Sequence, residues 1–244
     1  METAAIDLAD RRVNKCGASL FFDAVTVEAA RRQGVNDLLA LIFGGRIGAM
    51  GDVNLTDLID AFAFVSPTML TTCWPAIESA GGPVTLQHVF SESVSKSADD
   101  NWDIAALRDI GDTARAVIAF GDGVALGLFT GWRAIALDPA SGGTSRDVAS
   151  LFALRELRGD IHIDSVRTVG LSPLEAEIAT RGPTIAELHG WPKPYPDAAP
   201  LEQRSLTAGR RTSERMAEIY GRAIDDATFG AFVDALDRLV LARE

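Results

Sequence analysis

Helical periodicity is the feature that most constrains the fold of this 244-residue chain. Apolar residues in two segments near the C-terminus recur at i, i+3, i+4 and i+7, followed by i+8 in the first segment and i+11 in the second, the spacing of one helix face. The first series is Met216, Ile219, Tyr220, Ala223 and Ile224, and the second is Phe229, Phe232, Val233, Leu236 and Val240. Strand-like alternation is almost absent. The sequence therefore predicts an all-α multi-helix bundle, with roughly 60–70% of residues helical against about one third in an average protein.

Capping residues and helix breakers set the predicted boundaries. Asn54 and Ser66 are typical N-cap residues, and Pro67 suits the first helical position. The pair Gly44–Gly45 is predicted to end a helix, and three prolines make 193–200 an irregular connection. The predicted helices before the final two are 26–33, 37–43, 55–63, 68–79, 84–97, 101–120, 146–168 and 173–181, and 122–137 is ambiguous.

Composition narrows the expected partners. The net charge of −11 disfavours binding to nucleic acid or to an anionic membrane surface. No long apolar run or signal peptide is visible, so we expect a cytoplasmic protein. His88 and His189 have no histidine or cysteine three or four residues away, so we expect no metal site. The sequence indicates no particular cofactor, and a homodimer stays open.

Five sequence blocks stand out in order along the chain: Phe21–Thr26, Phe43–Gly51, Phe62–Pro67, Leu154–His162 and Leu206–Arg211. Together they resemble the actinobacterial SalK-like family, whose members contain a helix-turn-helix. The last block also resembles the junction between wing and helix in MarR-type winged helices. The resemblance implies a helical domain over 1–170, and a degenerate winged helix with a C-terminal helical hairpin packed on it over 171–244. It implies no particular reaction.

The chain departs from the family pattern in two respects. Asp23 and Ser66 stand where that pattern has histidine, so only His162 is left of a three-histidine set. The prolines of 193–200 occupy the place of the helix that would read a DNA groove. Residues 171–244 carry 9 Lys and Arg against 12 Asp and Glu, a net charge of 9 − 12 = −3. We therefore expect no specific binding to nucleic acid.

Three basic side chains fall on a face of 146–168 that should be buried. At about 100° per residue, Arg155, Arg158 and His162 share an arc with apolar residues. A buried arginine needs a carboxylate, a carbonyl or an anionic ligand, and Asp23 is a plausible partner, with Arg133 adding to the cluster. The apolar residues of the arc are Val148, Leu151, Phe152 and Val166, and the side expected to face solvent carries Glu156, Asp160, Asp164 and Arg167.

This basic face allows a structural and a functional interpretation. It is either a buried ion-pair network or an anion-binding pocket, and Gly159 indicates either close helix packing or room for a ligand. The favoured function is the binding of a small acidic molecule by Arg155, Arg158, His162 and Arg133. One alternative is an enzyme in which His162 acts as acid–base, aided by Asp23, while the arginines orient an acidic substrate. The other is a DNA-binding transcriptional regulator.

Overall fold

The computed structural model describes residues 1–121 and 127–241, and these form thirteen α-helices, two short 3₁₀ helices and no strand. The helical share is 80%, above the expected range, and the all-α prediction is confirmed. The helices are α1 (Thr3–Phe21), α2 (Ala24–Arg32), α3 (Leu38–Ile47), α4 (Leu55–Ala61), α5 (Pro67–Ser79), α6 (Gly82–Asn101), α7 (Ile104–Ala119), α8 (Leu128–Leu137), α9 (Gly143–Thr168), α10 (Pro173–Arg181), α11 (Pro183–Leu188), α12 (Glu202–Ala223) and α13 (Asp226–Leu241).

Most helix starts follow the capping residues. The Asn54 side chain accepts from the backbone N–H of Asp57 in a capping box, and Ser66 accepts from that of Met69. Of the ambiguous stretch 122–137, residues 128–137 form α8, and 122–126 lie outside the described residues. The pattern did not predict α1 or the short α11.

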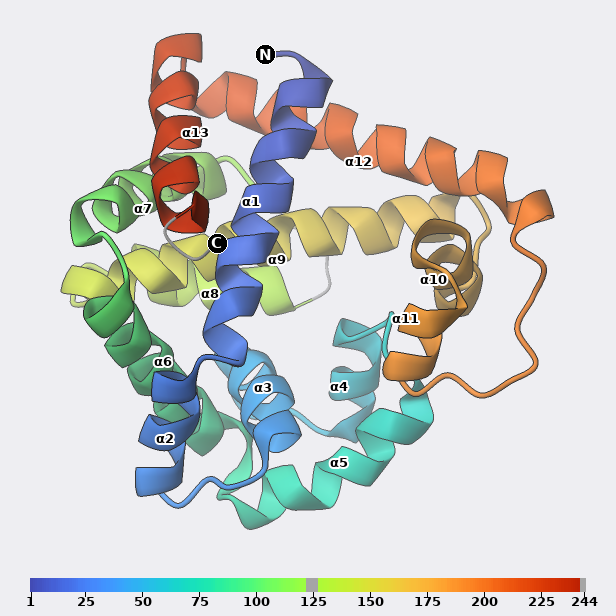
Figure 1. Ribbon diagram of the computed structural model, residues 1–244, viewed down its shortest axis with the longest axis horizontal. Helices are drawn as coiled ribbons and strands as arrows, with labels where there is room; N and C mark the ends of the chain where they lie inside the picture. Colours follow the sequence, from blue (N-terminus) through green and yellow to red (C-terminus); the bar gives the residue numbers. More distant parts are fainter. Residues whose placement is uncertain (122–126, 242–244) are drawn as a thin grey trace.

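Helix α9 is the central element of the bundle. It packs against α1, α6, α7, α8 and α12, and Figure 1 shows it crossing the middle of the molecule with α1 running across it. Eight consecutive residues, Asp147 to Leu154, are buried. A helix buried over eight successive residues has neighbours on all sides, so it has no single solvent face in this stretch.

Glycines bring α3 against α6. The prediction that Gly44–Gly45 ends the helix is wrong, because α3 continues through both residues to Ile47. A methyl group at Gly45 would overlap the ring of Phe90, and one at Gly48 would overlap the backbone carbonyl of Pro83. The glycines therefore allow close helix contact at this point rather than ending the helix, and the contact fixes the position of Arg46 between them.

The C-terminal part has its own small apolar cluster. Helices α10 and α11 are separated only by Gly182, whose φ of +82° suits glycine. Of the predicted irregular connection 193–200, residues 193–198 contain no helix, whereas Ala199 and Pro200 fall in the short 3₁₀ helix η2 (Ala199–Leu201). The division at 170 and 171 stays a prediction. The small cluster consists of Val166, Leu171, Ala176, Leu201 and Ala208, while the main core runs from α1 to α13.

Within the described ranges, no single helix is both long and apolar enough to span a membrane. The segments Leu38–Met50 and Leu55–Ala61 reach that length and composition only as a pair, and the angle between them is 96°.

Candidate functional site

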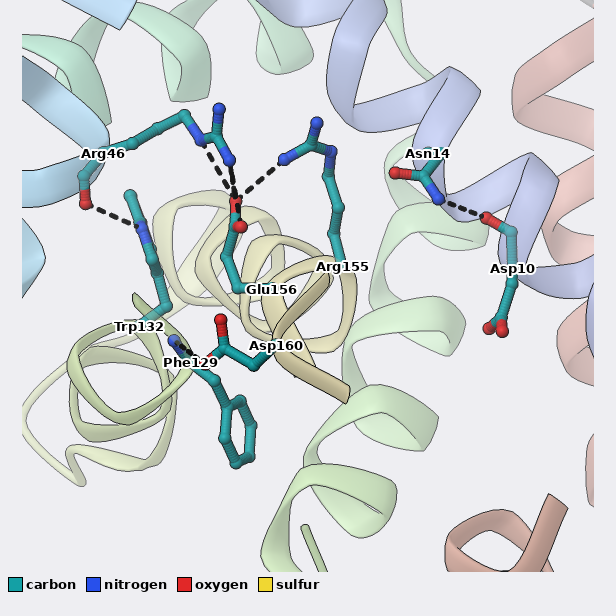
Figure 2. Close-up of polar contacts among 8 residues, drawn as sticks. All are labelled: Asp10, Asn14, Arg46, Phe129, Trp132, Arg155, Glu156 and Asp160. Carbon is teal, nitrogen blue, oxygen red and sulfur yellow. Dashed lines mark hydrogen bonds and ion pairs between the residues drawn. The ribbon is translucent and has the colours of Figure 1, made fainter. Parts of the chain in front are cut away.

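Two arginines share one buried carboxylate at the centre of the molecule. The Nε and Nη2 of Arg46 donate to the Glu156 carboxylate at 3.1 and 2.9 Å, and Arg155 Nη1 donates to it at 2.8 Å (Figure 2). The Glu156 side chain is 4% exposed, while those of Arg46 and Arg155 are 11% and 18% exposed. Burial acts to raise the pKa of Glu156, but the charges of Arg46 and Arg155 and their hydrogen bonds outweigh it and lower that pKa.

Aromatic rings and a glycine hold the two guanidinium groups in place. The Arg155 Cζ lies 5.3 Å from the ring centroid of Phe21, and the stem of this arginine passes directly over Gly17 of α1. The Arg46 Cζ lies 4.5 Å from the ring centroid of Phe62. Burial, followed by the nearby charge of Arg46, lowers the pKa of Arg155 to about 10, so this arginine stays charged at neutral pH.

One edge of the Arg155 guanidinium has no acceptor. Its Nη1 is used by Glu156, whereas its Nε is buried and has no hydrogen-bond partner. Figure 2 shows one further nitrogen on Arg46 and one on Arg155 that both point to the same side, away from Glu156. Two buried cations therefore face one carboxylate and leave donors unused.

The next carboxyl group along α9, that of Asp160, does not neutralise the second arginine. Asp160 is 2% exposed and accepts from the backbone N–H of Phe129 at 3.2 Å. Burial, followed by the charge of Glu156, raises its pKa to about 8, so it is mostly protonated at neutral pH. Counting Arg46 and Arg155 against ionised Glu156, the cluster carries one uncompensated positive charge.

We expect the substitution Asp160→Asn to flatten the fall in stability with pH. The folded-state pKa of about 8 lies above the unfolded value of 3.8, so the favourable contribution of this group is complete below pH 3.8 and disappears as the pH rises to 8. Asparagine keeps an acceptor for Phe129 and cannot ionise, so the variant should gain a few kcal/mol relative to wild type between pH 5 and 8. Denaturant unfolding of both proteins at pH 5 and at pH 8 measures this difference in stability. An identical pH profile for the two proteins would contradict the assignment of a neutral Asp160.

Gly159 leaves room next to this cluster. A methyl group placed on it would meet only Glu156 Oε2, at 3.9 Å, and no other helix lies within contact distance. The Cα–Cβ bonds of a helix tilt towards its N-terminus, so a side chain at 159 would cover Arg155 and Glu156. Close helix packing, one of the two interpretations of Gly159, is therefore not found at this position, and the other stays a prediction. We call Arg46, Arg155, Glu156 and Gly159 the arginine site.

The three predicted basic residues lie on one face of α9 but have three different partners. Arg155 pairs with Glu156, whereas Arg158 Nε donates to buried Asp10 of α1 at 3.1 Å. Burial raises the pKa of Asp10 to about 7, and the charge of Arg158 opposes that rise. His162 Nδ1 lies 3.0 Å from Thr212 Oγ1 on α12. Burial, and then the charge of Arg158, lowers the pKa of His162 to about 4, so its ring is neutral at neutral pH.

The prediction of which side of α9 faces solvent is confirmed for two of the four residues and wrong for the other two. Asp164 and Arg167 are exposed as predicted, but Glu156 and Asp160 are buried. The error arises because α8 and the Arg46 side chain of α3 cover this side of the helix, and a sequence pattern cannot show these tertiary contacts.

Asp23 and Arg133 are placed away from the roles expected for them. The Asp23 carboxylate caps α2 by accepting from the backbone N–H of Val25, and it also accepts from Asn101. Arg133 donates to the carbonyl of Ala119 and lies over the ring of Phe129. The sequence reasoning missed Arg46, although that residue sits in the glycine-rich block singled out above.

Two further observations concern metal ligands and surface grooves. Among the residues that the structure describes, no group of three or more His, Cys, Asp or Glu side chains is placed to hold a metal ion. An open groove of about 310 Å³ lies between the start of α3 and α5, and it does not include the arginine site. Its lining residues are Asp37, Leu39, Thr68, Met69, Thr72, Cys73 and Gly190.

Comparison with known families gives one match. A family model described as a helix-turn-helix family matches residues 7–242, a range that includes the whole arginine site. Comparisons with curated proteins and with solved structures found no match.

Proposed function

The chain belongs to the helix-turn-helix family, and we propose that it binds a small acidic molecule at the arginine site. The supporting observation is the buried Nε of Arg155, which has no acceptor and lies in a cluster of two cations and one carboxylate. Burying a charged donor without an acceptor costs several kcal/mol. An anionic group bound beside Arg155 would supply both the acceptor and the missing charge.

The competing interpretation is an ion-pair network that only holds helices together. Under that interpretation, removing one arginine strands Glu156 and destabilises the protein. Under the binding interpretation, Arg155 is surplus to the Arg46–Glu156 pair, because Arg46 already donates two hydrogen bonds to this carboxylate. The two interpretations therefore predict opposite effects of an Arg155 substitution.

We expect Arg155→Gln to abolish acid binding at little cost in stability. A ligand at about a hundred times its Kd adds about 2.7 kcal/mol of stability, which raises the Tm of a chain of this size by several degrees. Thermal melts with a panel of small carboxylic acids should show this rise for wild type and for Arg167→Gln, an exposed control on the same helix, and not for Arg155→Gln. A loss of a few kcal/mol in Arg155→Gln, with no acid raising the wild-type Tm, would instead support the ion-pair network.

Gly159→Leu tests the space itself. Leucine favours a helix over glycine by about 1 kcal/mol, so the variant should fold at least as well as wild type. Its side chain would cover Arg155 and Glu156 and exclude the ligand, whereas Gly159→Ala should retain binding. Binding that survives in the leucine variant would place the ligand elsewhere.

The protonation state of His162 and its hydrogen bond favour binding over catalysis. Its ring is neutral, and its hydrogen bond is to the Thr212 hydroxyl rather than to Asp23 or another carboxylate. A general acid–base group works best with a pKa near the working pH, and this one lies about two to three units below neutrality. A pH-dependent turnover that is abolished by His162→Asn would favour the enzyme instead.

We further propose that the chain does not read duplex DNA. Residues 193–198, at the place of the helix that would read a DNA groove, form no helix, so the basic or amide side chains that read base edges have no helix there to present them. No wing strand occurs in the described residues. A sequence-specific mobility shift at physiological salt would contradict this proposal. The same proposal includes two finer points. The chain is similar to SalK-like proteins, with a reduced MarR-like part at the C-terminus, and it is located in the cytoplasm.

A further inference from the structure

We propose that the ligand extends along α9 from Arg155 to His162, with a carboxylate at the first residue and a hydrogen-bond donor at the second. This inference rests on the proposed function and adds the chemical class of the ligand. The class is a flat carboxylic acid that carries a hydroxyl or N–H group at its far end.

The carboxylate end follows from the free edge of Arg155. Its Nη1 is occupied by Glu156, so its Nε and Nη2 are the remaining pair of adjacent donors. Two parallel N–H groups of a guanidinium match the two oxygens of a carboxylate. The single surplus charge of the cluster matches one such group.

The donor end follows from the hydrogen bonds of Thr212. Its hydroxyl donates to the carbonyl of Ala208 at 2.8 Å, so towards His162 its oxygen accepts. The proton of the neutral imidazole is therefore on Nδ1, and Nε2 carries a lone pair. Within the described part of the chain, the ring forms no other hydrogen bond, and its second nitrogen points away from α12.

The two ends lie on one face of α9 with an open stretch between them. At about 100° per residue, Arg155, Gly159 and His162 fall within about 60° of one another around the helix axis. Positions 155 and 162 are about 10 Å apart along that axis, and Gly159 between them has no side chain. A ligand can therefore reach both anchors across the glycine.

Aromatic rings flank both anchors. The Phe21 ring lies against Arg46 and Arg155, with its centroid 5.5 and 5.3 Å from their Cζ atoms. The Phe64 ring covers one face of His162, with centroids 5.5 Å apart and planes inclined by 30°. These surfaces suit a flat apolar body between the two polar ends.

The neutral histidine also sets what the site rejects. Nε2 can accept a hydrogen bond but cannot donate one. A second carboxylate at the far end of the ligand would therefore lie against the lone pair of Nε2 and find no donor there. The site should prefer a hydroxy acid to the dicarboxylic acid of the same length.

Calorimetric titration of the full chain with matched acids tests the inference. The probes are benzoate, phenylacetate and 3-phenylpropanoate, each paired with its 4-hydroxy derivative, because the series varies the distance between the two ends. We expect at least one hydroxylated acid to bind about three- to tenfold more tightly than its partner, the effect of one neutral hydrogen bond. His162→Phe should remove this preference, while His162→Gln, which keeps an acceptor, should restore part of it.

Thr212→Val provides a second variant. It keeps the size of the buried side chain but removes the hydroxyl that holds the proton of His162 on Nδ1, so it should weaken the preference for the hydroxylated acid. If the acids bind in a manner that depends on Arg155 but the hydroxyl makes no difference, this inference is overturned and the proposed function stands. If no acid binds, or if acids bind equally well to Arg155→Gln, both this inference and the proposed function are overturned.

Discussion

Replacing Glu156 with glutamine should lower the free energy of unfolding by about 3–5 kcal/mol. The substitution keeps the shape of the side chain but removes the negative charge that Arg46 and Arg155 share. Two buried guanidinium groups would then repel one another with no carboxylate between them. Denaturant unfolding followed by circular dichroism measures the loss.

The matched control for this prediction is Asp164→Asn. Asp164 lies on the same helix and is exposed, so its loss of charge should change stability by less than about 0.5 kcal/mol. The double variant Glu156→Gln with Arg46→Met should recover part of the loss, since it removes one of the two stranded cations. A Glu156→Gln protein as stable as wild type would mean that the arginines are solvated rather than paired.

The substitution Gly48→Ala should be strongly destabilising. Gly48 has ordinary helical dihedral angles, so alanine is not strained there by backbone conformation. The added methyl group would instead overlap the carbonyl of Pro83 at the start of α6. Overpacking against rigid backbone costs about 1–3 kcal/mol or more, and the displacement of η1 (Gly48–Met50) and α3 would also move Arg46.

Gly209→Ala is the control for this second prediction. Gly209 lies inside α12 with nothing near its Cα, so alanine should stabilise the protein by about 0.5–1 kcal/mol through helix propensity. Thermal melts of the two alanine variants should therefore move in opposite directions. A Gly48→Ala protein that melts at or above the wild-type temperature would contradict the close contact between α3 and α6.

The sequence predicted those elements whose determinants are local. Asn54 and Ser66 begin helices because a side-chain oxygen satisfies a backbone N–H three residues away, a contact visible in the sequence. Helix α1 escaped prediction because its buried face includes Asp10 and Gly17, which read as polar or as breakers. These residues are buried because Arg158 and Arg155 reach them from α9, and no local pattern encodes that.

The candidate site was predictable only in part for the same reason. The helical angle placed Arg155, Arg158 and His162 on one face and required a partner for buried arginine. The partners themselves depend on tertiary packing, since Arg46 and Glu156 are 110 positions apart and Asp10 and Arg158 are 148 apart. Gly159 was recognised as unusual, but only the surrounding helices show which side of it is open.

The packing of α1 against α13 has a consequence for synthesis on the ribosome. The two helices are in contact, and Arg12 pairs with Asp237 across a separation of 225 residues. At about 5–20 residues per second, α1 emerges roughly 10–45 s before the helix that covers it. Helices α6, α9 and α12 also pack on α1, but the part of its surface that α13 covers is exposed for that interval. The nascent chain should therefore depend on chaperones until α13 has left the exit tunnel, and substitutions that weaken α13 should reduce the yield of soluble protein more than they reduce the stability of protein already folded.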